Sequence, residues 1–505
     1  MVKIKYLKIL IIFLVFSYSY DINGQKVRKI NFSAINMEFD NSINNGAFKL
    51  SGNVEFEHEG TKMYCDSAYY YPNTNSFDAY GNIHIIQSDT INLYGDILNY
   101  DGNTRIAIIT GNVLLSVKDQ TELRTESLSF DLKNNIGYYN KSAQITRDIN
   151  KLTSKIGYYY TRKNTYFFKE NVKIENPDYT IYSDTLEYNT KTNIAYLKGK
   201  TKIITQDTTI ILCEDGWYNM DTDISSLRKN VIIKSNKGQN IVGDSIYYNR
   251  KLKDAYAFNN VVLNDTTQNL ILKGNYAHYN EITGYSLLTK NALMIQYSNK
   301  DSLFIKADTL ISIKDTSNNR IFKAYYKVKL YKSDFQGKCD SAIFTTIDST
   351  FYLYKEPIIW TGDNQLTAEI IEIAIKNKTV DQLRLKKLAI IANKVDSFKY
   401  NQIKGNLVTC YFKNDSLYKI DISGNCETIY YPEDNNEIIG INFAKSSYIT
   451  IYISENKIDK IKFSGQPEAS LYPLEKAPIE KTQFSDFKWM EELRPKNKYE
   501  LLIKN

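Results

Sequence analysis

Hydrophobic and polar positions alternate along almost the whole chain, and the pattern repeats at a nearly fixed interval. A well-formed example is Ser183-Asp184-Thr185-Leu186-Glu187-Tyr188, in which a small residue and an acid precede an apolar and an aromatic residue at alternate positions. Side chains two positions apart share one face of a strand, so each such segment predicts a β-strand with an apolar face. The position of the acid recurs every 29 to 33 residues, at Asp66, Asp96, Glu126, Lys155, Asp184, Glu214, Asp244, Asn275, Asp308, Asp340 and Glu369.

A second landmark falls between these strands, and it consists of Asn followed by an aliphatic residue. The tripeptides are Gly52-Asn53-Val54, Gly81-Asn82-Ile83, Gly111-Asn112-Val113, Glu170-Asn171-Val172, Lys229-Asn230-Val231, Asn259-Asn260-Val261 and Lys290-Asn291-Ala292. Gly and Asn tolerate positive φ, so we interpret each as a turn that precedes a strand. Self-similarity at this period is typical of a repeat architecture. The sequence therefore predicts one β array from about residue 45 to about residue 465, with two or three short strands per unit.

A single unit cannot fold alone. Burying two or three apolar side chains contributes about 1.5–3 kcal/mol each, whereas ordering the backbone costs about 1–2 kcal/mol for each of about thirty residues. The units must therefore stack, and stacking encloses an apolar interior between two facing sheets. The predicted fold is all-β, an elongated two-sheet repeat array.

The two ends of the chain differ from the array. Residues 1–24 carry three lysines, an apolar run at 9–16 and small residues after it, which is typical of a secretory signal peptide. A cytosolic protein with an apolar first strand is the alternative. Residues 25–300 hold the regular repeats and 301–466 the degenerate ones. Residues 467–505 contain four of the eight prolines, and apolar residues at three-residue spacing over 484–493 predict a short amphipathic helix. We expect this tail to cap the open end of the array, and a docking segment for a partner is the alternative.

Composition and charge make some classes of function unexpected for this chain. The net charge is +7 for the whole chain, and removing three lysines and one aspartate with residues 1–24 lowers it to +5. The charges are interspersed, so nucleic acid is not an expected partner. The three histidines are isolated and are expected at the surface. No phosphate-binding loop or nucleophile elbow is present. We therefore predict no enzyme activity, no catalytic residues, no cofactor and no metal.

Cysteine and acid positions have structural explanations. Cys65, Cys213 and Cys339 each precede an acid position where other units have Gly, Ser, Thr or Ala, so smallness is what they share. A disulfide between Cys410 and Cys426 remains open. We expect the acid to lie at a bend or bulge and to accept backbone N–H groups. A ladder of metal-binding carboxylates is the alternative, but one acid per unit does not supply the converging oxygens that Ca²⁺ requires.

The phased recurrence of these motifs resembles a known family. The match is carried by Gly52-Asn53-Val54 and Gly111-Asn112-Val113, and by the small–acid–x–apolar–x–aromatic strands that begin at Cys65, Gly95 and Gly243. The chain resembles the OstA/LptA-like (organic solvent tolerance) proteins of lipopolysaccharide transport, closely over about 45–300 and loosely over 300–465. It is longer than the short bridge proteins of that family, and we expect it to have no outer-membrane barrel like that of the family's assembly protein.

The resemblance implies a twisted, partly open β-jellyroll in the periplasm, exported through a cleaved signal peptide, with association at the outer membrane left open. It implies a non-enzymatic bridge that carries acyl chains of lipopolysaccharide or a related glycolipid in an apolar groove toward the outer membrane. Transport components of the inner and outer membranes would be the partners at its two ends. An exported structural or adhesive β-solenoid with a closed core is the alternative. The expected groove-lining residues are Leu98, Tyr100, Leu128, Phe130, Leu186, Tyr188, Ile246 and Tyr248.

Overall fold

The protein is described by a computed structural model that covers residues 29–41, 46–87, 90–117, 121–298, 301–317, 319–377, 379–413, 416–434, 437–455 and 457–502. Antiparallel β-strands make up most of these residues, which confirms the predicted all-β class. The predicted signal peptide, residues 1–24, lies outside the described residues. The chain divides into two compact units, of which the first comprises Met1–Pro177 and Thr185–Lys191 and the second Asp178–Asp184 and Thr192–Asn505. The domain limits that we placed at residues 300 and 466 remain a prediction.

The first unit contains short terminal strands followed by a series of longer ones. Its elements are β1 Asn31–Ser33, β2 Asn36–Asp40, β3 Ala47–His58, β4 Thr61–Tyr71, β5 Ser76–Gln87, β6 Ile91–Asp101, β7 Ile106–Val117, β8 Thr121–Asp131, β9 Ile136–Tyr139, β10 Ala143–Arg147, β11 Asn150–Ser154, β12 Ile156–Tyr160, η1 Thr161–Lys163 and β13 Thr165–Asn176. Strand β14, Tyr179–Asn189, is divided between the two units.

The second unit continues the same kind of strand and ends in an irregular segment. Its strands are β15 Ile194–Thr205, β16 Ile210–Asn219, β17 Ile224–Lys234, β18 Gln239–Asn249, β19 Asp254–Asp265, β20 Leu270–Asn280, β21 Tyr285–Gln296, β22 Leu303–Lys314, β23 Arg320–Lys332, β24 Phe335–Thr345, β25 Thr350–Tyr354, β26 Ile358–Thr361, β27 Asn364–Thr367, β28 Ile370–Lys376, β29 Thr379–Lys394, β30 Tyr400–Lys413, β31 Ser416–Tyr430, β32 Glu433–Asp434, β33 Glu437–Ile438, β34 Ile441–Ser454, β35 Lys457–Ser464 and β36 Glu468–Tyr472. The helical elements are η2 Leu474–Lys476, η3 Ile479–Lys481, η4 Glu491–Leu493 and α2 Lys498–Leu502.

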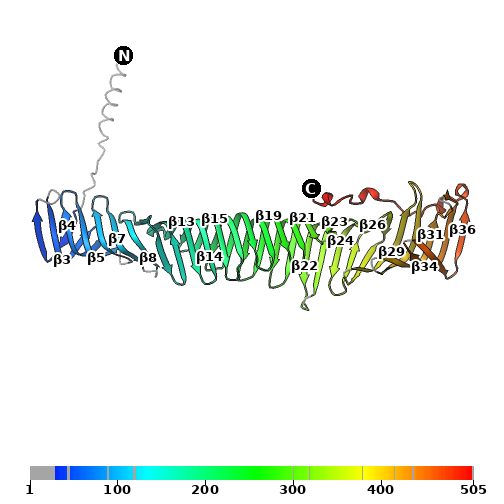
Figure 1. The fold of residues 1–505 in the computed structure, drawn as a ribbon, viewed down its shortest axis with the longest axis horizontal. Coiled ribbons are helices and arrows are strands. Elements are labelled where there is room, and N and C mark those ends of the chain that lie inside the picture. The colour runs from blue at the N-terminus through cyan, green and yellow to red at the C-terminus, as the bar shows by residue number, and fades with distance from the viewer. Residues whose placement is uncertain are drawn as a thin grey trace, which may run out of the picture. The chain divides into compact units, whose positions relative to one another are not determined.

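Within each unit the long strands pair antiparallel with their neighbours in sequence (Figure 1). Several long strands pair on one side with two short ones: β3 with β1 and β2, β8 with β9 and β10, β13 with β11 and β12, β24 with β25 and β26, β29 with β27 and β28, and β34 with β35 and β36. Pairing between neighbours in sequence needs only tight turns, which the Gly-, Asn- and Thr-containing connections provide.

The Asn-containing landmarks are β-bulges inside continuous strands, so our interpretation of them as turns is wrong. In β3 the pairing with β4 passes from Ser51–Ser67 to Val54–Cys65. Gly52 and Asn53, with φ of 81° and 45°, therefore lie opposite a single residue of β4. Their tolerance of positive φ serves a bulge that bends the strand without ending it.

Each bulge divides a strand into two arms. We call the half that carries the aromatic residues four positions after each acid the aromatic arm, and the half on the other side of the bulge the aliphatic arm. The two facing sheets that we predicted are these two arms of the same strands. Each repeat of about thirty residues therefore supplies two long bent strands, where the sequence predicts two or three short ones.

The alternation of inward-facing and outward-facing residues along a strand shifts by one position at the acid. In β4, Met63 and Cys65 are buried before the acid, whereas Ala68 and Tyr70 are buried after it. Two consecutive residues, Asp66 and Ser67, thus separate the buried ones, and Asp66 is exposed. The shift explains how a carboxylate can share the spacing of the apolar positions without being buried.

The acid is confirmed to lie at the bulge, but its donors are more often side chains than the backbone. The Asn of the neighbouring bulge donates its amide to the carboxylate in the pairs Asn82–Asp66 (2.9 Å), Asn112–Asp96 (2.8 Å), Asn230–Glu214 (3.0 Å) and Asn260–Asp244 (3.1 Å). The backbone N–H of Lys200 donates to Asp184 at 3.1 Å, as expected. In the repeat that has Lys155 at the acid position, the charges are reversed: Glu170 lies at the bulge and forms an ion pair with Lys155 at 2.8 Å.

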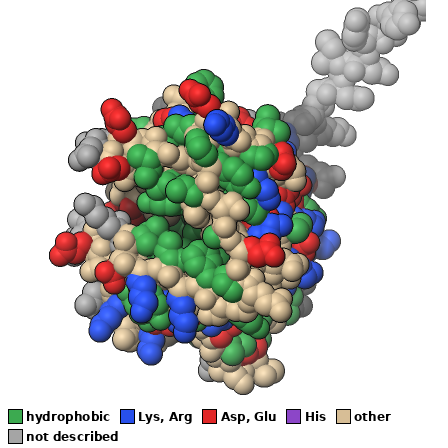
Figure 2. All heavy atoms as spheres, turned by 90° about the vertical axis from the view of Figure 1, so that its right-hand side faces the viewer, with side chains coloured by type: hydrophobic (Ala, Val, Ile, Leu, Met, Phe, Trp, Pro, Cys, Tyr) green, Lys and Arg blue, Asp and Glu red, His purple; other side chains and the backbone are tan. Residues whose placement is uncertain are grey.

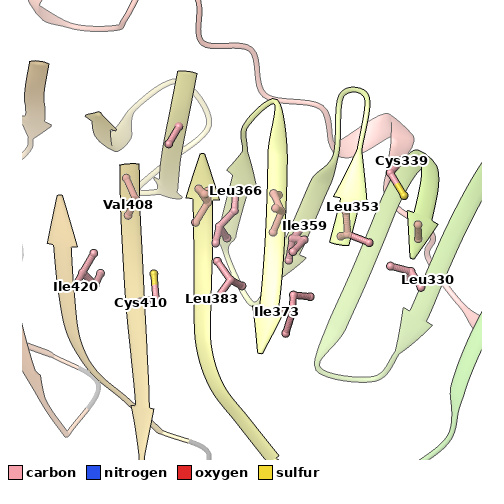
Figure 3. Close-up of a cluster of buried hydrophobic side chains, with 14 of the residues drawn as sticks. Leu330, Cys339, Leu353, Ile359, Leu366, Ile373, Leu383, Val408, Cys410 and Ile420 are labelled. Carbon is pink, nitrogen blue, oxygen red and sulfur yellow. The ribbon is translucent and has the colours of Figure 1, made fainter. Parts of the chain in front are cut away.

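The core of the second unit is best formed over β22–β34. Inward-facing side chains from successive strands meet there, among them Leu353, Leu385 and Val408, each fully buried. Figure 3 shows Leu330, Leu353, Leu366, Leu383 and neighbours pointing into this common interior. Strands β34–β36 form one end of the second unit, and at this end hydrophobic side chains surround a hollow (Figure 2).

The tail returns along the second unit, where we had expected it to cap the end of the array. Residues 473–502, which we call the strap, run back from β36 toward β22 and β23 (Figure 1). Phe484 and Phe487 pack on Ile390 and Ile429, which face outward from the aliphatic arm. The predicted helix over 484–493 is wrong: only the 3₁₀ turn η4 forms there, and the α-helix lies at Lys498–Leu502.

The strap's backbone is held by buried glutamines of the sheet, which explains why the strap needs no helix. Gln365 donates to the carbonyl of Lys488 at 2.8 Å and accepts from the N–H of Met490 at 2.7 Å. Gln402 accepts from the N–H of Phe484 at 3.1 Å. These bonds satisfy backbone groups that a helix would otherwise satisfy internally.

Candidate functional site

The apolar interior between the two arms is the candidate site, and in the first unit it is closed. Phe56 of the aliphatic arm stacks on Phe77 of the aromatic arm with ring centroids 3.7 Å apart. His58 and Tyr100 are hydrogen-bonded between the arms at 2.7 Å, and both side chains are buried. Burial raises the pKa of Tyr100. Side chains from the two arms thus fill the space between them.

The predicted groove residues of the first unit all face this interior. Leu98, Tyr100, Leu128, Phe130 and Leu186 are buried, with Phe130 fully so. Tyr188 is half-buried, and its hydroxyl accepts a hydrogen bond from Arg147 at 3.2 Å. In the second unit Ile246 is buried and Tyr248 is half-buried. All eight residues thus lie on the inner face of the aromatic arm of their own unit, where they remain predicted lipid contacts.

In the second unit the interior opens over β15–β20, a stretch that we call the open segment. At the base of the arms, next to the bulges, Leu197, Leu227, Val231 and Val261 are buried. Farther out on the aliphatic arm, one cross-strand row is half-buried throughout. It consists of Ile203, Ile211, Ile233, Ile241, Leu263 and Leu272, each paired with the next.

The matching row on the aromatic arm alternates tyrosines with small residues. It consists of Ala195, Tyr218, Ser225, Tyr248, Ala255 and Tyr279, again each paired with the next. Tyr279 is 48% exposed although it faces inward. In the first unit the corresponding row is Phe48, Tyr70, Phe77, Tyr100, Ala107 and Phe130, and it carries more ring surface. Because the tyrosines alternate with small residues on neighbouring strands, side chains do not fill the space between the two arms of the open segment.

Sequence reasoning did not find the aliphatic row or the Ala/Ser positions. The signal was present, since Ala195, Ser225 and Ala255 recur about thirty residues apart, but their register against the tyrosines was needed to interpret it.

Two contacts cross the mouth of the open segment near its first strands. Asp178, in the turn before β14 at the aliphatic-arm side, forms an ion pair at 3.1 Å with Arg250, in the turn after β18 at the aromatic-arm side. Tyr179 meets Tyr218 edge-to-face at 6.1 Å. The hydroxyl of Tyr218 donates to Asp223 at 2.6 Å. Burial, and then this hydrogen bond to Asp223, raises the pKa of Tyr218.

The interior closes again at β22. Met294 is half-buried, but its partner Ile305 and the next residue in that row, Leu330, are 6% and 5% exposed. The closed part coincides with the strands that the strap covers, since Leu501 of α2 packs on the outward-facing Leu293 and Phe304.

The positions of the histidines and cysteines test two expectations from the sequence. Of the histidines, the buried His58 contradicts the surface position that we expected, whereas His278 pairs with Asp254 at 2.8 Å. All five cysteines are free and buried, so Cys410 and Cys426 do not form the disulfide that the sequence left open. Burial raises the pKa of the Cys213 thiol to about 11.

Neither a metal-binding cluster nor a membrane-spanning helix occurs among the described residues. Within them, no three His, Cys, Asp or Glu side chains gather in a way that could hold a metal ion. No helix in the same part of the chain combines the length and the apolar character needed to cross a bilayer.

Bent antiparallel strands around an apolar interior, closed in some stretches and open in another, define a β repeat protein with an internal groove. Residues 30–184 match the model of a family described as OstA-like protein, which confirms the predicted resemblance over that part of the chain. Among solved structures, the chain is similar to LptH of Pseudomonas aeruginosa, described as the LptA homologous periplasmic component of the lipopolysaccharide transport device. The two are 17% identical, the match covers 21% of this chain and 81% of that one, and the TM-score is 0.20. The comparison with curated proteins gave no match.

Proposed function

We propose that the protein is a non-enzymatic periplasmic bridge that carries the acyl chains of lipopolysaccharide, or of a related glycolipid, in its apolar interior toward the outer membrane. The observation that carries this proposal is the open segment, in which a half-buried aliphatic row on one arm lies across the interior from a tyrosine-containing row on the other. The OstA-like match over residues 30–184 supports the same function. Membrane-bound transport components would be the partners at its ends.

An acyl chain fits the chemistry of these rows. Each buried methylene contributes about 0.8 kcal/mol, so a chain of about ten methylenes lying between the rows gains several kcal/mol after its ordering cost. Side chains such as Ile233, Ile241 and Leu263 would lose their remaining exposure in the complex. The sugar and phosphate headgroup would stay in water at the mouth, because burying it without partners is costly.

The closed interior of the first unit favours the second candidate, an exported structural β-solenoid. Its filled core needs no ligand to be stable, and the contact between Phe56 and Phe77 leaves no room for an acyl chain at that point. A bridge function therefore requires that the first unit open, or that lipid enter at the open segment.

Photo-crosslinking in cells tests the proposal. A photoreactive residue is placed at Tyr248, which faces inward, and for comparison at Tyr247, which is its neighbour and faces outward. We expect a lipopolysaccharide adduct at position 248 and none at 247. A third site at Tyr100, in the closed first unit, reports whether lipid passes there too. A folded, exported protein without an adduct at 248 would refute the bridge and favour the structural solenoid.

A further inference from the structure

One turn on the lip of the open segment is strongly basic. The turn 250–253 on the aromatic arm contains Arg250, Lys251 and Lys253, whereas the turns on either side of it, 220–223 and 281–284, contain acids and no Lys or Arg. On the opposite lip, the turns 206–209, 235–238 and 266–269 consist mainly of Thr, Asn, Gln, Ser and Gly. The charge that distinguishes the mouth is therefore gathered in a single turn.

The three cations are held by exchangeable partners. Arg250 pairs with Asp178 at 3.1 Å, and both side chains are about half exposed, at 49% and 50%. Lys253 pairs with Glu281 at 3.3 Å, also in solvent. Lys251 donates to the backbone carbonyl of Asp221 at 2.7 Å. Exposed ion pairs contribute little to stability, so an incoming anion with several oxygens can replace such partners.

The basic turn also lies next to the lining of the groove. Tyr248, in the inward-facing row, is two residues before Arg250. Burial raises the pKa of Tyr248, with the charge of Glu281 adding to the rise and those of Lys253 and Arg250 opposing it, so these charges lie close to the phenol. An anion at the turn would therefore lie directly above a tail that occupies the open segment.

We propose that the turn 250–253 binds the anionic, phosphate-bearing headgroup of the amphiphile, and that this headgroup replaces Asp178 as the partner of Arg250. The inference rests on the proposed function, since it needs a tail in the groove. Arg binds phosphate through two parallel N–H···O bonds, and the two lysines add point charges beside it. Because Asp178 belongs to the other side of the mouth, binding of the headgroup releases the ion pair that crosses it. The opposite lip, rich in Thr, Asn, Gln and Ser, offers hydroxyl and amide groups to a sugar.

The test measures equilibrium binding of labelled dodecyl phosphate and dodecyl maltoside, both below their critical micelle concentrations, to the full mature chain. In the R250Q/K251Q/K253Q variant we expect the affinity for dodecyl phosphate to fall at least tenfold and that for dodecyl maltoside to stay within twofold. The control variant K200Q/K202Q/K234Q loses the same charge from exposed positions on β15 and β17 and should bind both amphiphiles like the wild type. Circular dichroism confirms that each variant is folded.

A second variant tests the exchange of partners. Asp178→Asn removes the competing carboxylate, so its affinity for dodecyl phosphate should rise several-fold. An unchanged affinity for dodecyl phosphate in the triple variant, or an equal loss for both amphiphiles, would overturn the headgroup site. Inorganic phosphate that binds as tightly as dodecyl phosphate would also overturn it, in favour of a free-anion site. If dodecyl maltoside failed to bind even the wild type, the groove itself, and with it the proposed function, would be refuted.

Discussion

The difference between the open and closed stretches can be measured by removing the same side chain from each. Ile371 is fully buried in the core of the second unit, whereas Ile233 lies in the half-buried aliphatic row. Replacing Ile with Ala removes roughly three carbon groups at about 0.8 kcal/mol each, and a cavity in a closed core adds about 1 kcal/mol. For Ile371→Ala we therefore expect a loss of about 3–4 kcal/mol in the free energy of unfolding. For Ile233→Ala we expect about 1 kcal/mol, since water already reaches the side chain and no cavity forms.

The assay is equilibrium unfolding in urea, followed by tryptophan fluorescence. All three tryptophans, Trp217, Trp360 and Trp489, belong to the second unit, so the signal reports the unit in which both substitutions lie. Because repeat arrays can unfold in parts, hydrogen exchange at β17 and β28 checks that each loss is assigned to the correct stretch. Equal losses for the two variants would show that the arms are packed together over β17 in solution, which would refute the open segment.

Four further outcomes follow from the geometry. All five thiols should resist alkylation in the native protein at pH 8 and all react after unfolding, as mass spectrometry would show; a missing pair would reveal a disulfide. The pKa of the Cys213 thiol is raised to about 11, so the protonated thiol contributes fully to stability below the ordinary thiol pKa near 9. This contribution should be lost as the pH rises toward 11, and the Cys213→Ala variant should not show that loss in its alkaline unfolding profile. Gly81→Ala should lower the melting temperature, since φ is 78° and the added Cβ would lie 2.3 Å from a carboxylate oxygen of Asp66, whereas Gly60→Ala, with open space around it, should lower it less. Gln365→Leu should free residues 488–490 for rapid hydrogen exchange, because both of their hydrogen bonds to the glutamine are lost; unchanged protection there would show that the apolar anchors hold the strap alone.

The repeat could be derived from sequence because its signals are local. The acid, the small residue before it and the aromatic four positions later all lie within one strand, so a period of about thirty residues was enough to predict an all-β stacked array. The bulge was misinterpreted for the same reason. Gly52 and Asn53 have the φ preferences of a turn, and only the pairing of Val54 with Cys65 shows that the strand continues through them.

The features that depend on distant partners could not be derived. The open segment depends on which residue faces Tyr218 and Tyr248 across the sheet, and the Ala or Ser there lies on a different strand. The burial of His58 depends on Tyr100, 42 residues away. The path of the strap depends on outward-facing residues such as Gln365 and Ile390, whose role nothing in their own strands indicates.

The strap also bears on the order in which the chain folds. Each long strand pairs with strands that are adjacent in sequence, so the array can form progressively as successive strands become available, by closing short loops. The strap is different, since its hydrogen bonds to Gln365 join residues 123 and 125 positions apart and the bond from Arg494 to Gln336 spans 158. Those bonds require strands β24 and β27 to be in place before the last thirty residues can dock. Docking of the strap therefore follows the assembly of the strands that it contacts, so it reports that this part of the second unit has formed.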